Sequence, residues 1–184
     1  MGQIKTLPAA KLIIGCIYNN SFIKDKAIAS LKGRYGAIDF ISPAIDFDYT
    51  DYYYQEMGRP LKRIFISFKR LVRQERLAQI KLYTNKLEQR FSKQRKRGIN
   101  IDPGILTLAK LILATTKDNV HRMYLGKGIF AEITLHYEQG GFKPWSWTYP
   151  DYQTIRYREI FNTIRGLYQE QVKEKHGSSL PKSI

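Results

Sequence analysis

The chain has 184 residues, of which 43% are hydrophobic and 13% aromatic, a composition that excludes a disordered protein and allows a substantial core. No run approaches the roughly 20 apolar residues of a membrane-spanning helix, and the N-terminal segment lacks the pattern of a secretory signal. The single cysteine, Cys16, excludes an intrachain disulfide. We therefore expect a cytoplasmic protein that does not bind membranes, while the oligomeric state stays open.

Positive charge is concentrated in one part of the chain. The formal net charge is +15 and the pI is near 9.9, which predicts a polyanionic partner such as nucleic acid or a nucleotide. Residues 59–97 contain fourteen lysines and arginines, opposed only by Glu75 and Glu88. Residues 39–56 contain five acidic residues and no lysine or arginine. An acidic segment therefore directly precedes a strongly basic one.

The first hundred residues predict the element order β-α-β-β-α-β. An aliphatic run at 11–18 predicts a buried strand, and Asn19-Asn20-Ser21 after it is a helix start signal. The helix predicted at 24–35 stops at Gly36, and an amphipathic basic helix covers 74–96. The remaining strands are predicted at 37–41, 61–72 and 99–101. This order is that of the ferredoxin-like split βαβ arrangement.

The second half of the chain predicts a hairpin and a final helix. The turn Gly126-Lys127-Gly128 centres a hairpin over 123–136, which a strand at 142–147 extends. Residues 106–115 fit a helix or a strand, and apolar residues at helical spacing over 157–168 predict the last helix. We expect an α+β fold with a ferredoxin-like βαββαβ core, a C-terminal β-hairpin extension and a final helix. A single domain would cover 1–176, followed by a polar C-terminal tail at 177–184.

Four segments of the chain carry a resemblance to a known family. They are Asp46-Phe47-Asp48-Tyr49-Thr50-Asp51-Tyr52-Tyr53, Asn100-Ile101-Asp102-Pro103-Gly104, Leu113-Ala114-Thr115-Thr116-Lys117-Asp118 leading to His121-Arg122, and Thr148-Tyr149-Pro150-Asp151-Tyr152. In this order they resemble an uncharacterised bacterial and archaeal family, domain of unknown function 4416, over about residues 8–170. The resemblance transfers no established activity, although some members of that family carry a GTP-binding label. This chain lacks the phosphate-binding loop Gly-x-x-x-x-Gly-Lys-Ser/Thr, and its Asn85-Lys86-Leu87-Glu88 has Glu where the guanine-reading pattern has Asp.

The first of these segments holds an acidic cluster. Clustered carboxylates are the ligands that Mg²⁺ or Mn²⁺ requires, so Asp46, Asp48 and Asp51 are candidate metal ligands. In the alternative interpretation the segment is a turn whose aromatic residues pack inward, and Asp51 caps a short helix.

Polar residues between 102 and 151 are the candidates for chemistry and for binding an anion. His121 can move a proton near neutral pH, and the carboxylates of Asp102 and Glu132 accompany it as catalytic candidates. In the alternative, Asp102-Pro103-Gly104 is a turn and Glu132 is an outward-facing strand residue. The candidates for binding a substrate or its phosphate are Lys110, Lys117, Arg122, Tyr149 and Asp151.

The aromatic segment 145–152 allows two interpretations. Its rings can stack on a base, but aromatic residues beside a proline more often pack at the edge of a core. In the second case Asp151 caps the final helix.

The basic helix and the strand before it predict a nucleic-acid surface. Solvated helix faces usually alternate in charge, whereas this one is nearly all positive. Each contact to a phosphate would steepen the salt dependence of binding. The candidate nucleic-acid contacts are Arg63, Arg70, Arg73, Arg76, Lys86 and Arg90.

The function that the sequence favours is a cytoplasmic nucleotide- or RNA-binding protein that recognises phosphate through basic residues. One alternative is a metal-assisted enzyme that acts on a phosphate-bearing small molecule, with Mg²⁺ or Mn²⁺ as its cofactor. A protein-interaction module is the other. The sequence does not decide whether the chain is an enzyme.

Overall fold

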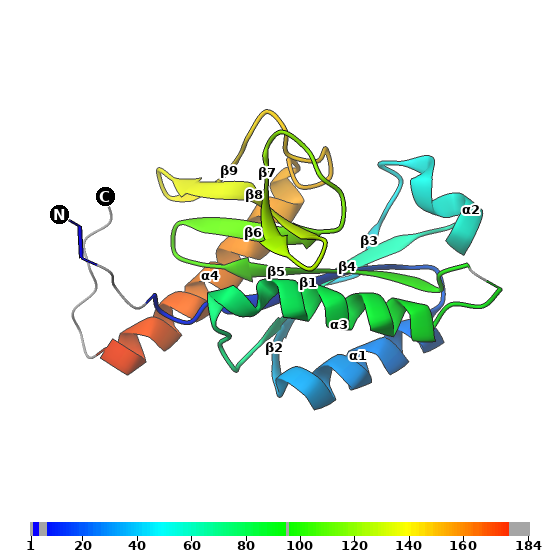
Figure 1. Cartoon of the computed structure of the whole chain (residues 1–184), viewed down its shortest axis with the longest axis horizontal. Coiled ribbons are helices and arrows are strands. Elements are labelled where there is room, and N and C mark those ends of the chain that lie inside the picture. The colour runs from blue at the N-terminus through cyan, green and yellow to red at the C-terminus, as the bar shows by residue number, and fades with distance from the viewer. Residues whose placement is uncertain (1, 4–6, 95, 177–184) are drawn as a thin grey trace.

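The computed structural model describes residues 2–3, 7–94 and 96–176, so the expected tail at 177–184 lies outside the described residues. The described residues form one nine-stranded antiparallel sheet and four α-helices (Figure 1). The α+β class is confirmed, and the sheet is larger than expected. The strands are β1 (Lys11–Tyr18), β2 (Ile38–Ile41), β3 (Ile45–Asp46), β4 (Lys62–Phe68), β5 (Ile99–Leu106), β6 (Lys110–Thr115), β7 (Arg122–Gly126), β8 (Ile129–Glu138) and β9 (Gly141–Pro144), and the α-helices are α1 (Ser21–Tyr35), α2 (Tyr54–Met57), α3 (Leu77–Arg90) and α4 (Ile155–His176).

Local sequence signals determine the ends of α1. The Asn20 side chain accepts hydrogen bonds from the backbone N–H groups of Phe22 and Ile23 at 2.9 and 3.2 Å, which satisfies donors that the first turn leaves free. Gly36 ends the helix at φ 92°, a backbone conformation that disfavours side chains. The start signal at 19–21 and the stop at Gly36 are therefore confirmed, and the helix begins three residues before the predicted range.

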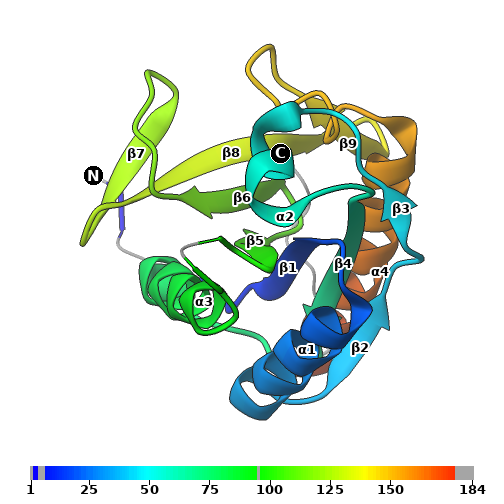
Figure 2. The ribbon, with the colours of Figure 1, turned by 90° about the vertical axis from the view of Figure 1, so that its right-hand side faces the viewer.

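The sheet has the order β2-β4-β1-β5-β6-β8-β7, with β3 paired to β4 and β9 paired to β8. Helices α1 and α3 pack on one face of its first half, where Leu31 and Leu87 meet Leu12 and Ile66 of the sheet. On the other face α4 packs through Phe161 and neighbouring aromatic residues (Figure 2). Because both faces are covered, all eight residues of β1 are buried. Among the described residues, no helix has the length and apolar character needed to cross a membrane.

The strand β5 differs from the prediction and creates the space for a site. Asp102-Pro103-Gly104, for which a turn was the alternative, is instead the middle of β5, where Pro103 lies opposite Ile14 of β1. The next strand, β6, pairs with β5 only along Gly104–Leu106. At Gly104 the two strands come so close that an added Cβ would lie 2.7 Å from the Ile112 oxygen. Beyond this point β6 leaves β5, and a gap opens beside Asp102.

Two further predictions change in extent. The helix expected at 74–96 is a 3-10 turn at Gln74–Arg76 followed by α3, which ends at Arg90. The ambiguous segment 106–115 belongs to the end of β5 and to β6. The hairpin around Gly126-Lys127-Gly128 is confirmed as β7 and β8.

Candidate functional site

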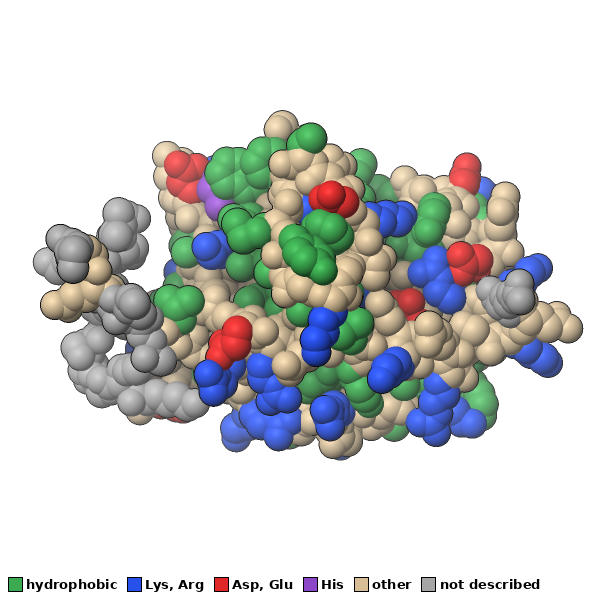
Figure 3. Space-filling model, viewed as in Figure 1, with side chains coloured by type: hydrophobic (Ala, Val, Ile, Leu, Met, Phe, Trp, Pro, Cys, Tyr) green, Lys and Arg blue, Asp and Glu red, His purple; other side chains and the backbone are tan. Residues whose placement is uncertain are grey.

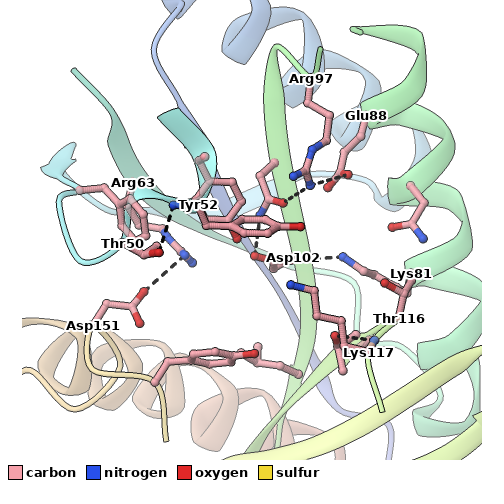
Figure 4. A pocket seen from close by; sticks show the side chains of 18 of the residues that line it. Thr50, Tyr52, Arg63, Lys81, Glu88, Arg97, Asp102, Thr116, Lys117 and Asp151 are labelled. Carbon is pink, nitrogen blue, oxygen red and sulfur yellow. Dashed lines mark hydrogen bonds and ion pairs between the residues drawn. The ribbon is translucent and has the colours of Figure 1, made fainter. Parts of the chain in front are cut away.

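A cavity of about 570 Å³ lies where β6 leaves β5. Its walls come from residues 47–53 before α2, from one side of α3, from β5, from the end of β6 and from residues 149–152 before α4. Cavities of this size hold one small molecule. Figure 4 shows charged side chains from several of these walls pointing into the same space.

Arg63 of β4 forms the floor of the cavity and is only 3% exposed. One terminal nitrogen, Nη1, donates to the Tyr152 hydroxyl at 3.1 Å, and the other, Nη2, lies 3.4 Å from the Asp151 carboxylate. Its Nε is buried without a hydrogen-bond partner in the described part of the chain. Gly15 on β1 leaves room for this side chain, because a Cβ there would lie 2.9 Å from Nη1. The guanidinium therefore has N–H groups left for an acceptor that enters the cavity.

Asp102 of β5 is the centre of the cavity's charged groups. Its Oδ1 accepts from Lys81 Nζ at 3.1 Å, and its Oδ2 accepts from Asn100 Nδ2 at 2.7 Å. Burial alone would raise the pKa of Asp102, but the positive charges of Lys81 and Arg63 outweigh burial and hold the pKa below its ordinary value. Asp102 is thus an ionised acceptor, and Lys81 and Lys117 reach toward it from α3 and from the end of β6 (Figure 4).

Glu88 lies two turns after Lys81 on α3 and is 7% exposed. Its Oε1 accepts from the Ile101 backbone N–H at 2.5 Å, and its Oε2 lies 3.8 Å from Arg97 Nη1. Arg97 is bound more closely to Glu56, at 2.5 and 3.0 Å. Burial raises the pKa of Glu88 to about 7. A carboxyl group that can gain or lose a proton near neutral pH therefore lines the cavity.

Five of the residues predicted to act in chemistry or anion binding line this cavity, and two more, Arg122 and His121, support it from behind. The guanidinium of Arg122 holds the cavity wall together. It donates to Glu132 Oε2 at 2.9 Å, to the Lys117 carbonyl at 3.0 Å and to the Tyr149 hydroxyl at 2.6 Å. The lining residues among the predicted set are Asp102, Lys117, Glu132, Tyr149 and Asp151.

His121 lies behind the same wall. Its Nε2 is 3.2 Å from Glu132 Oε2, and its ring stacks on Trp147 at a centroid distance of 5.6 Å. Trp147 in turn stacks on Trp145 at 5.1 Å. His121 therefore reaches the cavity only through Glu132.

The three acidic residues predicted to hold a metal are not brought together. Asp46 lies 3.3 Å from Lys62 and Asp51 lies 3.0 Å from Arg59, and both carboxylates are more than 80% exposed. Asp48 is also exposed. Among the described residues, no three His, Cys, Asp or Glu side chains are grouped closely enough to hold a metal ion.

Two other predicted roles change. Lys110 lies opposite His136 in the β6–β8 ladder, away from the cavity lining. Asp151 does not cap α4, because its carboxylate faces Arg63. Thr154 takes that role, and its Oγ1 accepts from the Tyr157 N–H at 3.3 Å.

Sequence reasoning missed the contribution of α3 to the site. Lys81, Asn85 and Glu88 of α3 line the cavity, and Ser92, just after the end of the helix, lines it as well. The spacing of four and three residues places the first three on one side of the helix. This polar stripe was visible beside the apolar one, but the segment Asn85-Lys86-Leu87-Glu88 was compared only with a guanine-reading motif. Arg97 and Asn100 were missed as well, because their partners depend on how the chain folds.

The predicted nucleic-acid contacts divide into one buried and five exposed residues. Arg63 is buried and lines the cavity, so it is not part of an exposed basic surface. The other side chains are exposed, and Lys and Arg gather over and below α3 in Figure 3. Two of the five already make contacts, since Arg70 donates to the Arg34 carbonyl at 2.7 Å and Arg73 pairs with Glu75 at 2.5 Å. The exposed residues are Arg70, Arg73, Arg76, Lys86 and Arg90.

The fold and the cavity define an α+β protein with a charge-lined cavity. The chain belongs to the family described as Domain of unknown function (DUF4416), whose model matches residues 8–168. This match confirms the resemblance found in the sequence. No curated protein matches the chain.

Proposed function

We propose that the protein binds a small phosphate-bearing molecule, of the size and kind of a nucleotide, in the cavity between β5 and β6. The observation that carries this proposal is Arg63, a 3% exposed cation that lines the cavity and whose two terminal nitrogens have one described partner each. Each terminal nitrogen has two N–H groups, so donors remain for a phosphate oxygen. Lys117 provides a second cation near the solvent.

The aromatic residues of the cavity support a ligand that also carries a flat ring. Tyr52, Tyr53 and Tyr149 line the space around Asp102. Lys117 Nζ lies 4.2 Å from the centre of the Tyr52 ring, so the cation and the ring already approach each other at the cavity wall. A nucleotide has both parts, a base for the rings and a phosphate for the cations.

The test is calorimetric titration of the protein with ATP, GTP and inorganic pyrophosphate. Lys117→Ala is expected to weaken binding of the best of these ligands about 10-fold, because a charged hydrogen bond to phosphate is lost at a partly exposed site. Lys32→Ala removes the same charge from an exposed position of α1 outside the cavity and serves as the control. Absence of binding of all three ligands at millimolar concentration would sink the proposal.

A second candidate function is binding of RNA on the basic surface over α3. The observation that favours it is the exposure of five cationic side chains over residues 70–90. Single-stranded RNA bound there should dissociate as salt rises, with the slope of log K against log salt falling by about 0.7 for each phosphate contact removed. The double variant Arg73→Gln/Arg76→Gln should reduce that slope measurably in fluorescence anisotropy. Equal slopes for the variant and the wild type would contradict this second function.

We also infer that β1, α1, β2, β4, α3 and β5 form a ferredoxin-like core. Its support is the antiparallel order β2-β4-β1-β5 with α1 and α3 packed on one face. The continuous sheet supports a single domain over residues 1–176. The free Cys16, which is fully buried, is compatible with the reducing cytoplasm. An experimental structure with another strand order would contradict the core assignment.

A further inference from the structure

The side of α3 that lines the cavity is directly next to a strip of cationic side chains. Asn85 and Gln89 line the cavity. Lys86 and Arg90 each follow one of them in α3, so they lie about 100° further around the same helix. Both side chains are exposed. We call these two residues the α3 strip.

The acidic residues of this part of the chain do not neutralise the α3 strip. Between residues 59 and 97 the only acidic residues are Glu75 and Glu88. Glu75 pairs with Arg73 at 2.5 Å, and Glu88 is buried toward Ile101 and Arg97. Among the described residues, neither Lys86 nor Arg90 forms an ion pair with an acidic side chain, so both cations are available to a polyanion.

The cavity itself is lined by a buried cation and by tyrosines. Arg63 is 3% exposed, so a group that contacts it lies inside the cavity and not on the outer surface. The volume of about 570 Å³ holds one small unit. Tyr49, Tyr52 and Tyr149 line the cavity and are 42%, 54% and 44% exposed, which leaves ring surface for a second unit outside.

We propose that the ligand is the phosphate-bearing end of a single-stranded nucleic acid. The terminal phosphate and nucleotide enter the cavity toward Arg63 and Lys117, the next base stacks on the exposed tyrosines, and the backbone continues along the α3 strip. This inference rests on the proposed function, since it uses the same cavity. It adds that a longer chain binds better than a free nucleotide.

The experiment compares three probes by competition in fluorescence anisotropy at constant salt. They are a free nucleoside monophosphate, a six-nucleotide RNA with a terminal phosphate, and the same RNA without that phosphate. We expect the phosphorylated RNA to bind at least about 10-fold more tightly than either of the others, because only it occupies the cavity and the α3 strip together. The 5′ and 3′ phosphates are tested separately.

Two variants test whether the α3 strip causes the tighter binding of the phosphorylated RNA. Lys86→Gln/Arg90→Gln is expected to lose most of the difference in affinity between the phosphorylated RNA and the monophosphate, and to keep only the part that stacking on the tyrosines supplies. Lys32→Gln on α1 is expected to keep the preference for the phosphorylated RNA. Circular dichroism checks that each variant is folded.

Each alternative result has a distinct meaning. Binding of the monophosphate with no gain for the phosphorylated RNA overturns this inference and leaves the proposed function standing. Equal binding of the RNAs with and without the terminal phosphate also overturns this inference, and it favours the second candidate function, RNA binding on the basic surface over α3. If none of the probes binds, the inference and the proposed function fail together.

Discussion

Replacing Arg63 with methionine is expected to lower the free energy of unfolding by about 3–5 kcal/mol. Methionine fills much of the space but leaves the Asp151 carboxylate buried without its cation, at 5% exposure. Breaking a buried ion pair from one side has this large cost because the remaining charge cannot be solvated. Urea denaturation at pH 7 measures the loss, and the melting temperature should fall with it.

Two controls separate the buried charge from other effects of the change. The double variant Arg63→Met/Asp151→Asn removes both charges and should recover most of the lost stability. Arg59→Met breaks the exposed pair with Asp51 and should cost no more than about 1 kcal/mol. Two outcomes would contradict a stabilising ion pair between Arg63 and Asp151. One is that Arg63→Met lowers the free energy of unfolding no more than Arg59→Met does. The other is that the double variant is no more stable than Arg63→Met.

Helix ends that depend on interactions between neighbouring residues could be predicted from the sequence. Asn20 caps α1 and Gly36 ends it because each acts on neighbouring residues of the same helix. The path of β5 through Pro103 could not be predicted in this way. Proline favours a turn locally, and here its place in a strand depends on pairing with β1, almost ninety residues earlier in the chain.

The burial of Arg63 could likewise be predicted only in part, because it depends on the local strand pattern and on residues far along the chain. Arg63, Phe65 and Ser67 alternate along β4, so the sequence already placed Arg63 on the same side of the strand as a buried phenylalanine. Its charge nevertheless suggested a surface residue. Only the meeting of β4 with residues 151–152 shows why a cation is stable there, since Asp151 and Tyr152 supply its partners.

The segments that resemble the family meet at one place. Each of the four segments contributes residues to the cavity wall, among them Tyr52, Asp102, Lys117 and Asp151. Their order along the chain gave no indication that they converge, because the sheet order β1-β5-β6-β8 brings them together. Arg122 and His121 belong to the same segments but support the wall from behind.

Stability is expected to fall as the pH rises through the pKa of Glu88. In the folded chain burial raises the pKa of Glu88 from 4.5 to about 7, so the folded state holds a proton that the unfolded state has lost between these two values. The stabilisation is complete below pH 4.5 and is lost as the pH passes 7. At about 1.4 kcal/mol per pKa unit the contribution is about 3 kcal/mol.

The measurement is urea denaturation of the wild type and of Glu88→Gln at intervals from pH 5 to 8. Glutamine has no proton to lose, and its amide oxygen can still accept from the Ile101 N–H, so the variant should lack this part of the pH dependence. Glu170→Gln on α4 removes an exposed carboxylate and should follow the wild-type profile. Parallel profiles of the wild type and Glu88→Gln would show that Glu88 does not change its protonation state in the folded chain between pH 5 and 8, which would contradict a pKa near 7.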